Sequence, residues 1–251
     1  MYLKTDGIIL GSVEYKDNDK LLTVLTSDLG KITVKARGAK SSRSKFKASC
    51  QLMAYSELTL QEYQGRYVLT EASTKELFSE LQTDLELLSL ASYFLQVTQC
   101  VAPEEDPLPE LLSLLLNALY AIGKLKKPQS LVKTVFELRL CAIIGFLPDL
   151  RGCMVCGKMR PDRFNITQGA LQCSTCRNEN TDGIRLPVSA STLDALRYIC
   201  SAEAKRIFSF TISEQALREL GGITESYLCM RLERGFSTLD FYKSLFYEAI
   251  P

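Results

Sequence analysis

The chain has 251 residues and no histidine. Imidazole most often transfers protons near neutral pH, so its absence argues against ordinary acid–base catalysis. The Gly-x4-Gly-Lys-[Ser/Thr] loop of NTPases is also missing. No stretch of eighteen apolar residues occurs, so the sequence predicts no membrane span. We therefore expect a binding protein that is not an enzyme, with no small-molecule substrate and no membrane partner.

The first residues, Met1 to Asp6, lack the charged-then-apolar start of a signal peptide. We therefore expect a cytoplasmic chain, in a compartment where disulfides are rare. Its net charge is only +1. The charge is unevenly spread, because residues 1–80 and 151–187 are basic whereas residues 81–150 are acidic. An anionic partner is expected to meet the basic segments.

Four of the nine cysteines form two C-x2-C pairs, Cys153/Cys156 and Cys173/Cys176. This spacing is typical of a structural zinc site in which each pair supplies two thiolates from one tight turn. Four thiolates close the coordination shell of one Zn²⁺, so the ion would stabilise the fold without catalysing a reaction. Two disulfides, or cysteines kept after the metal was lost, are the alternatives.

Several cations flank these cysteines and can offset the two negative charges of a Zn²⁺ ion bound by four thiolates. They are Arg151, Lys158, Arg160, Arg163 and Arg177. Their side chains are expected either to donate hydrogen bonds to the sulfurs or to contact phosphates.

The first 80 residues read as a β unit, because short apolar runs alternate with turn signals. Five strands are predicted, over Thr5–Val13, Lys20–Thr26, Lys31–Ala36, Met53–Gln61 and Arg66–Ala72. Ser27-Asp28-Leu29-Gly30 and Gln64-Gly65 are the expected tight turns. Five strands of this size indicate an OB-type barrel, with a small SH3-like barrel as the alternative.

A basic loop follows the third predicted strand, and no acidic residue occurs from Leu29 to Ser56. Six of its cations are candidate DNA contacts: Lys35, Arg37, Lys40, Arg43, Lys45 and Lys47. A solvated loop without a ligand is the alternative. Phe46 lies among these cations, and it is expected either to stack on a base or to anchor the loop to the barrel.

Helical periodicity extends from about Glu76 to Phe146 and returns after the four-cysteine segment. Helices are predicted from about Asp84 to Val101, after Pro109, after Pro128, from a capping box at Ser191-Thr-Leu-Asp194, from about Ser213 and over Leu239–Tyr247. Gly221-Gly222 is expected to interrupt the helix that starts at Ser213.

We therefore predict an α+β multidomain protein. An N-terminal five-stranded OB-type barrel is followed by an α-helical domain with an inserted four-cysteine zinc ribbon. The expected segments are 1–80 for the barrel, 81–150 and 188–251 for the two parts of the helical domain, and 151–187 for the ribbon.

Three motifs in order resemble one known family. They are Ser27-Asp-Leu-Gly-Lys31, then Ala36-Arg-Gly-Ala-Lys40 with Ser44-Lys-Phe46, then Gly145-Phe-Leu-Pro-Asp-Leu-Arg-Gly-Cys-Met-Val-Cys-Gly157 before the second C-x2-C pair. The sequence is similar over essentially its whole length to the bacterial RecO recombination mediators.

The resemblance implies a non-enzymatic protein of DNA repair and homologous recombination, associated with the nucleoid. Such a protein binds single- and double-stranded DNA and anneals complementary strands. With RecR it helps to load RecA onto DNA coated by single-strand-binding protein, whose acidic C-terminal tail is bound by the helical region. The family's DNA-binding region falls on the six loop cations, and its zinc ligands fall on Cys153, Cys156, Cys173 and Cys176.

Two other functions remain open from the residues alone. An RNA-binding OB and zinc-ribbon factor of transcription or translation would prefer RNA to DNA, because it would contact 2′-hydroxyl groups. A protein-interaction scaffold would keep its activity after charge reversal at Arg37 and Lys40, because in that case the basic loop contacts solvent and no ligand.

Overall fold

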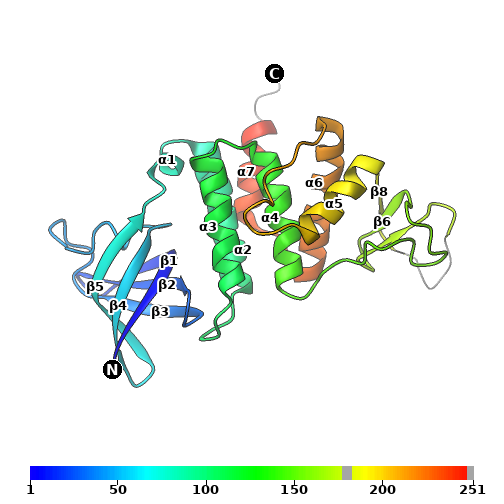
Figure 1. The fold of residues 1–251 in the computed structure, drawn as a ribbon. Helices are drawn as coiled ribbons and strands as arrows, with labels where there is room; N and C mark the ends of the chain where they lie inside the picture. Colours follow the sequence, from blue (N-terminus) through cyan, green and yellow to red (C-terminus); the bar gives the residue numbers. More distant parts are fainter. Residues whose placement is uncertain (177–182, 248–251) are drawn as a thin grey trace. The chain divides into compact units, whose positions relative to one another are not determined.

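The computed structural model describes residues 1–176 and 183–247 (Figure 1). The chain forms two compact units, Met1–Gly123 together with the chain from Phe236 onward, and Lys124–Gly235. The four segments expected from the sequence remain our proposal for the order of modules along the chain. Within the described ranges, no helix has the length and apolarity needed to cross a membrane.

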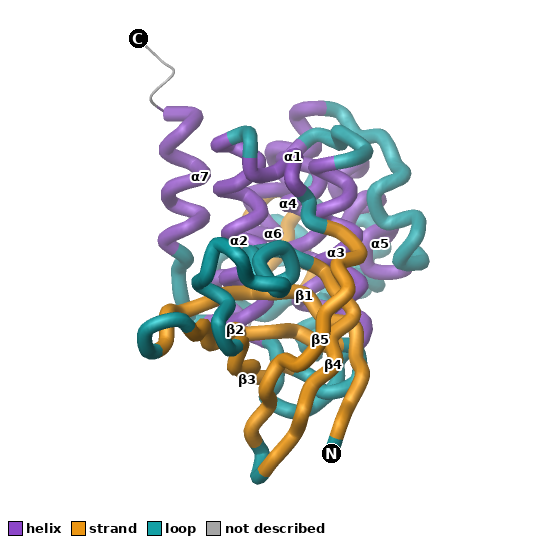
Figure 2. The backbone as a smooth tube through the Cα atoms, turned by 90° about the vertical axis from the view of Figure 1, so that its left-hand side faces the viewer, coloured by secondary structure: helices purple, strands orange, loops and turns teal. Residues whose placement is uncertain are grey.

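The first unit opens with a five-stranded barrel. Its strands are β1 (Tyr2–Tyr15), β2 (Asp19–Thr26), β3 (Lys31–Ala36), β4 (Tyr55–Tyr63) and β5 (Arg66–Glu76). The barrel closes in the order β1-β2-β3-β5-β4, with β3 and β5 parallel and all other neighbours antiparallel. Figure 2 shows its strands in orange. This is an OB-type barrel, so the predicted fold is confirmed and the SH3-like alternative is set aside.

Alternation along the strands builds the barrel core. In β3, Ile32, Val34 and Ala36 are buried while the residues between them face outward. The register of β1 shifts between Ile9 and Gly11. Such a bulge bends the strand, and β1 pairs with β4 through its first half and with β2 through its second.

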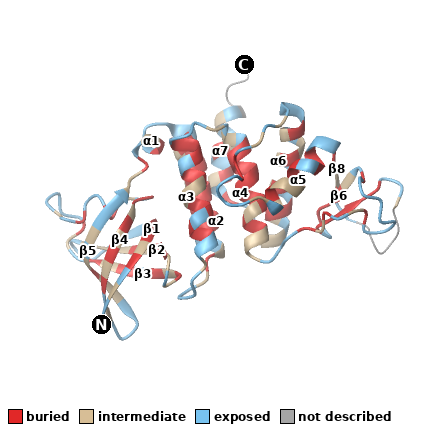
Figure 3. Ribbon diagram, in the orientation of Figure 1, coloured by how far each residue is buried: buried red, intermediate tan, exposed pale blue. Residues whose placement is uncertain are grey.

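Four helices complete the first unit: α1 (Ser79–Gln82), α2 (Leu85–Val101), α3 (Pro109–Gly123) and α7 (Ser237–Tyr247). Asp84 caps α2 by accepting a hydrogen bond from the Leu87 backbone N–H at 3.0 Å. The chain before α7 packs on α2, where the rings of Tyr93 and Phe236 meet edge to face with their centroids 5.8 Å apart. The buried sides of α2 and α3 are visible in Figure 3.

The Ser27–Gly30 turn joins the barrel to the connection between α2 and α3. Gly30 has a φ of +67°, and a Cβ atom there would lie 2.5 Å from the backbone nitrogen of Asp106. Beside it, the Lys31 backbone N–H donates to Pro103 O, and the Lys31 carbonyl accepts from the Glu105 N–H, each at 3.1 Å. The turn therefore has no room for a side chain at position 30.

The described residues of the second unit contain three helices, α4 (Gln129–Ile143), α5 (Ala190–Ser201) and α6 (Glu214–Leu232), and three short strands, β6 (Arg163–Asn165), β7 (Ala170–Gln172) and β8 (Arg185–Pro187). The strands form a sheet in the order β7-β6-β8.

A buried ionic cluster lies between α4 and α6. Lys133 Nζ lies 2.8 Å from carboxylate oxygens of both Glu137 and Glu225, and Thr224 Oγ1 donates to Glu137 Oε2 at 2.8 Å. Burial alone would lower the pKa of Lys133, but attraction to the two carboxylates raises it overall. Lys133 is therefore charged at neutral pH and fixes the register of the two helices.

Two local expectations were wrong. Helix α5 begins at Ala190 with Ser189 as its N-cap, two residues before the predicted cap at Ser191. Helix α6 continues through Gly221-Gly222. A Cβ atom at Gly221 would lie 3.3 Å from Thr134 Oγ1 of α4, so this glycine permits close helix packing without ending the helix.

We predict that Gly30→Ala destabilises the protein more than Gly65→Ala does. Both glycines have positive φ, which costs another residue about 1–2 kcal/mol, but nothing lies within 4 Å of a Cβ atom at Gly65. At Gly30 the Asp106 backbone must also move, at a cost of about 1–3 kcal/mol. Urea unfolding followed by circular dichroism measures both variants. If both variants lose the same free energy of unfolding, the close approach to the Asp106 backbone does not contribute to the cost at position 30.

Candidate nucleic-acid interface and metal centre

The connection from β3 to β4, residues 37–54, crosses one end of the barrel as a series of tight turns. Phe46 and Cys50 lie in the barrel core with Ala39. Phe46 is only 6% exposed, so it anchors the loop, and the alternative in which it stacks on a base is set aside.

Three of the six predicted DNA-binding cations are held by the barrel. Lys35 Nζ lies 3.0 Å from Asp19, Lys40 Nζ lies 2.9 Å from Glu14, and Lys45 Nζ donates to the Thr70 carbonyl at 3.0 Å. The other three are Arg37, Arg43 and Lys47, which are exposed. Across residues 1–176 and 183–247, no side-chain hydrogen bond or ion pair engages these three.

The carboxylates beside the loop are fully ionised at neutral pH. The Gly38 N–H and then Lys35 lower the pKa of Asp19, and Lys40 lowers the pKa of Glu14. An anion would have to compete with these carboxylates for Lys35 and Lys40, whereas no ion pair holds Arg37, Arg43 or Lys47 within the described residues.

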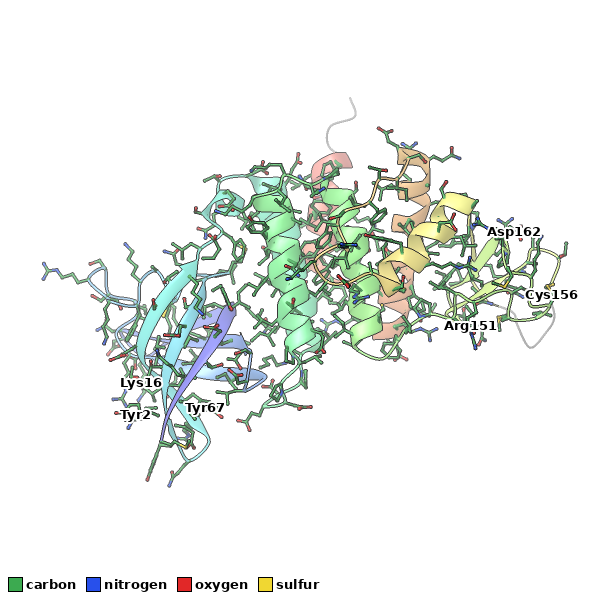
Figure 4. The ribbon with its side chains drawn as sticks, in the orientation of Figure 1. Tyr2, Lys16, Tyr67, Arg151, Cys156 and Asp162 are labelled. Atoms are coloured by element: carbon green, nitrogen blue, oxygen red, sulfur yellow. The ribbon has the colours of Figure 1, made fainter. Side chains whose placement is uncertain are left out.

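A groove of about 730 Å³ lies beside the loop, on the outer face of β2 and β3. The turn after β1 and the hairpin between β4 and β5 form its other walls. Its polar, charged and aromatic lining comprises Tyr15, Lys16, Thr33, Lys35, Arg37, Gln61, Tyr63, Arg66 and Tyr67. Lys16 and Tyr67 are labelled on the barrel in Figure 4. In OB folds this face and these two turns are the usual binding surface for oligonucleotides.

The groove combines aromatic rings with cations. Lys35 Nζ lies 5.1 Å and Lys16 Nζ 5.5 Å from the centroid of the Tyr15 ring, within cation–π distance. Tyr63 is 69% exposed, so its ring is accessible to an unpaired base. The sequence patterns did not single out Lys16 and Arg66. The available signal was an aromatic residue close to a cation at two places: Tyr15-Lys16, between the first two predicted strands, and Tyr63 and Arg66, on either side of the predicted Gln64-Gly65 turn.

The four predicted metal ligands come together in the second unit. The sulfurs of Cys153, Cys156, Cys173 and Cys176 all lie within 4.8 Å of one another. Cys156 Sγ and Cys173 Sγ are 3.8 Å apart, which is about the edge of a tetrahedron whose ligands lie 2.3 Å from a zinc ion. A disulfide requires about 2.05 Å. The arrangement fits a metal ion better than disulfides.

Backbone hydrogen bonds shape the two cysteine turns. Gly157 N donates to Cys153 O and Cys153 N to Lys158 O, both at 2.8 Å, and Cys176 N donates to Cys173 O at 3.1 Å. Met154 N also donates to Leu171 O at 2.8 Å, which attaches the first turn to β7. The small sheet therefore brings two sequence-distant turns to one point.

The sulfurs of this cluster affect one another's ionisation. Burial acts to raise the pKa of Cys153, yet backbone N–H groups of the two turns lower it overall to about 6. Burial, and then the neighbouring sulfurs of Cys153 and Cys156, raise the pKa of Cys173 to about 12. Four thiolates repel one another unless a cation lies between them, so this donor set is suited to a divalent metal.

Among the flanking cations that the structure describes, Arg151, Arg160 and Arg163 bond to other groups and not to the sulfurs. Arg151 pairs with Asp149 at 2.7 Å, Arg160 pairs with Asp194 at 3.1 Å, and Arg163 donates to the Asp162 carbonyl at 3.4 Å. A backbone group donates instead, from Cys173 N to Cys153 Sγ at 3.3 Å. Arg177 lies outside the described residues. Arg151, Cys156 and Asp162 are labelled in Figure 4.

Comparison with known proteins identifies the family. Residues 1–78 match the family described as Recombination protein O N terminal, and residues 82–240 match Recombination protein O C terminal. The protein named DNA repair protein RecO from Acetivibrio thermocellus is 34% identical over 246 residues, 97% of each chain. Its namesake from Caldicellulosiruptor bescii is 29% identical over 243 residues, 96% of this chain and 98% of the relative. The one from Dehalococcoides mccartyi is 31% identical over 245 residues, 96% and 95% of the two chains.

These matches cover both compact units and confirm the resemblance carried by the three sequence motifs. The chain therefore belongs to the RecO family of DNA repair proteins.

Proposed function

We propose that this chain is a recombination mediator that binds single- and double-stranded DNA through its barrel. In this proposal it anneals complementary strands and, with RecR, helps to load RecA onto DNA coated by single-strand-binding protein. The observation that carries the proposal is the groove on the β2–β3 face, which is lined by cations and tyrosines. The RecO family supports the role in DNA repair.

Each part of the proposed interface has a separate task. The exposed rings of Tyr15 and Tyr63 stack on unpaired bases, which any base sequence permits. Arg37 and Arg66, which line the groove, bind phosphates. Arg43 and Lys47 extend the phosphate-binding surface along the exposed β3–β4 loop.

Annealing requires two strands to approach with reduced repulsion. Neutralisation of phosphates on the barrel supplies this reduction without making or breaking a covalent bond. The proposal therefore needs no catalytic residue. RecR and the acidic tail of single-strand-binding protein are the proposed protein partners, and the proposed location is the cytoplasm, at the nucleoid.

We further propose that the four cysteines hold one Zn²⁺ ion. Four thiolates at these separations suit zinc, and a closed tetrahedral shell gives it a structural role. The ion would hold the two cysteine turns of the ribbon together.

The groove cations are expected to set the salt dependence of DNA binding. If all six loop cations and Arg66 meet phosphates, log affinity for single-stranded DNA falls against log salt with a slope of about −5. Replacing Arg37 and Arg66 together by alanine should make the slope shallower by about 1.4, because each lost phosphate contact removes about 0.7. Fluorescence anisotropy of a labelled oligonucleotide across a salt series measures this slope.

The matched control is Lys4→Ala with Lys75→Ala. It removes the same charge from the barrel, but these lysines pair with Glu57 and Asp6 and do not line the groove. The control should retain a slope close to the original. Equal effects of the two double variants would place the DNA elsewhere, and no binding by the unmodified chain would refute the DNA-binding proposal.

Tyr63→Ala tests base stacking separately from charge. Loss of one stacked base costs about 1–3 kcal/mol, so affinity for single-stranded DNA should fall by about 5- to 150-fold. Affinity for a duplex should change less, since its bases are already stacked. Tyr120→Ala is the control, because Tyr120 is 47% exposed but lies on α3. A Tyr63 variant that binds single strands normally would remove stacking from the proposed mechanism.

Cys156→Ser should abolish stoichiometric zinc binding. The unmodified chain is expected to carry one zinc ion per molecule by atomic absorption after dialysis, because four thiolates bind zinc tightly. Cys200→Ser is the control, since Cys200 lies on α5 outside the cluster and should not alter the zinc content. Absence of zinc from the unmodified chain after refolding with excess metal would exclude a zinc site.

A further inference from the structure

The side chain of Arg197, on helix α5, reaches the loop that carries the first two cysteines. We name residues 150–159 the first knuckle, because this loop carries Cys153 and Cys156. The Arg197 guanidinium donates three hydrogen bonds to backbone carbonyl oxygens of the knuckle: Leu150 O at 2.9 Å, Arg151 O at 3.2 Å and Met159 O at 2.7 Å.

The three acceptors lie at the two ends of the knuckle. Two precede Cys153 and one follows Cys156, so one guanidinium joins the entry of the loop to its exit. The bonds within the knuckle, between Cys153 and residues 157 and 158, close only its central turn. Arg197 therefore supplies a second closure outside the first.

The kind of side chain matters at this position. A guanidinium is planar and presents several N–H groups in a fixed fork, so it can reach acceptors on two strands of a loop at once. A lysine ammonium is a single compact donor centre and holds such an arrangement less well. The geometry around Arg197 uses this fork, with Nε bonded to one carbonyl and Nη2 to the other two.

The charge of Arg197 is also directed differently from that of its neighbours. Arg151 and Arg160 form ion pairs with Asp149 and Asp194. All three hydrogen bonds of Arg197 go to neutral carbonyls. Its positive charge would therefore help to offset the net negative charge of a centre in which four thiolates bind one divalent metal ion.

We propose that Arg197 is a positioning residue of the metal centre. By holding both ends of the first knuckle, it preorganises Cys153 and Cys156 and makes the metal centre continuous with the helices of its unit. Without Arg197, the knuckle would lose its conformational freedom only when the metal binds. This loss of entropy would weaken metal binding. The inference rests on the zinc site proposed above.

The first test is the rate of zinc release from the full chain to a chromogenic chelator. Groups outside the coordination shell that orient metal ligands typically change affinity by about 10- to 100-fold. Arg197→Met should therefore release zinc at least about tenfold faster than the unmodified chain. Arg160→Met is the matched control, since it removes another arginine that links the ribbon to α5, but one that bonds Asp194 and not the knuckle. Its release rate should stay close to the original.

The second test is the absorption spectrum after cobalt replaces zinc. Arg197→Met should need more Co²⁺ to reach saturation, and the saturated spectrum should still show tetrahedral thiolate coordination, because all four ligands remain. Arg197→Lys should restore only part of the affinity. If circular dichroism shows that Arg197→Met does not fold, Arg197→Lys becomes the test of the positioning role. This variant keeps the positive charge and loses only the planar set of N–H donors.

The outcomes separate this inference from the proposal on which it rests. An unmodified chain that binds neither zinc nor cobalt would refute the metal site itself. An unmodified chain that binds metal, with Arg197 variants that release it no faster than Arg160→Met, would overturn the positioning role alone. Faster release confined to the Arg197 variants would support it.

Discussion

Closure of the barrel depends on one short parallel contact. Strands β3 and β5 pair at only two positions, Val34 with Tyr67 and Lys35 with Val68. Parallel neighbours cannot be joined by a tight turn, so the chain needs long connections around this contact. The connection over residues 37–54 crosses the barrel end, and Phe46 fixes it in the core. The same closure places Lys35 and Tyr67 in one groove, so the proposed DNA surface follows from the topology of the barrel.

The two proposed sites use opposite electrostatic arrangements. On the barrel, Asp19 and Glu14 already balance part of the positive charge. This balance limits non-specific attraction to anions. The remaining cations would then set the orientation of a bound strand. In the ribbon, the sulfurs carry the negative charge and a metal ion would balance it. Both arrangements need a rigid support, which is a closed sheet in one case and a pair of hydrogen-bonded turns in the other.

Features determined by nearby residues could be predicted from the sequence, and features determined by packing could not. The five strands, the start of α2 beside Asp84 and the cysteine cluster depend on local alternation, a local hydrogen bond and fixed ligand spacing. The start of α5 was missed because Glu219 of α6 accepts a hydrogen bond from Ser189 N, a partner distant in sequence. The helix through Gly221 was missed because the contact with α4 outweighs its low helix propensity. The groove was missed because its walls come from three separate segments.

The return of the chain to its first unit has a consequence for biosynthesis. Helix α7 packs on α2, but more than a hundred residues of the second unit are translated between them. While a ribosome makes those residues, the surface of α2 around Tyr93 lacks the ring of Phe236 that covers it in the finished protein. The first unit therefore reaches its final packing only after the second has been synthesised. A nascent chain that stalls before this point would expose an apolar surface that chaperones and proteases recognise.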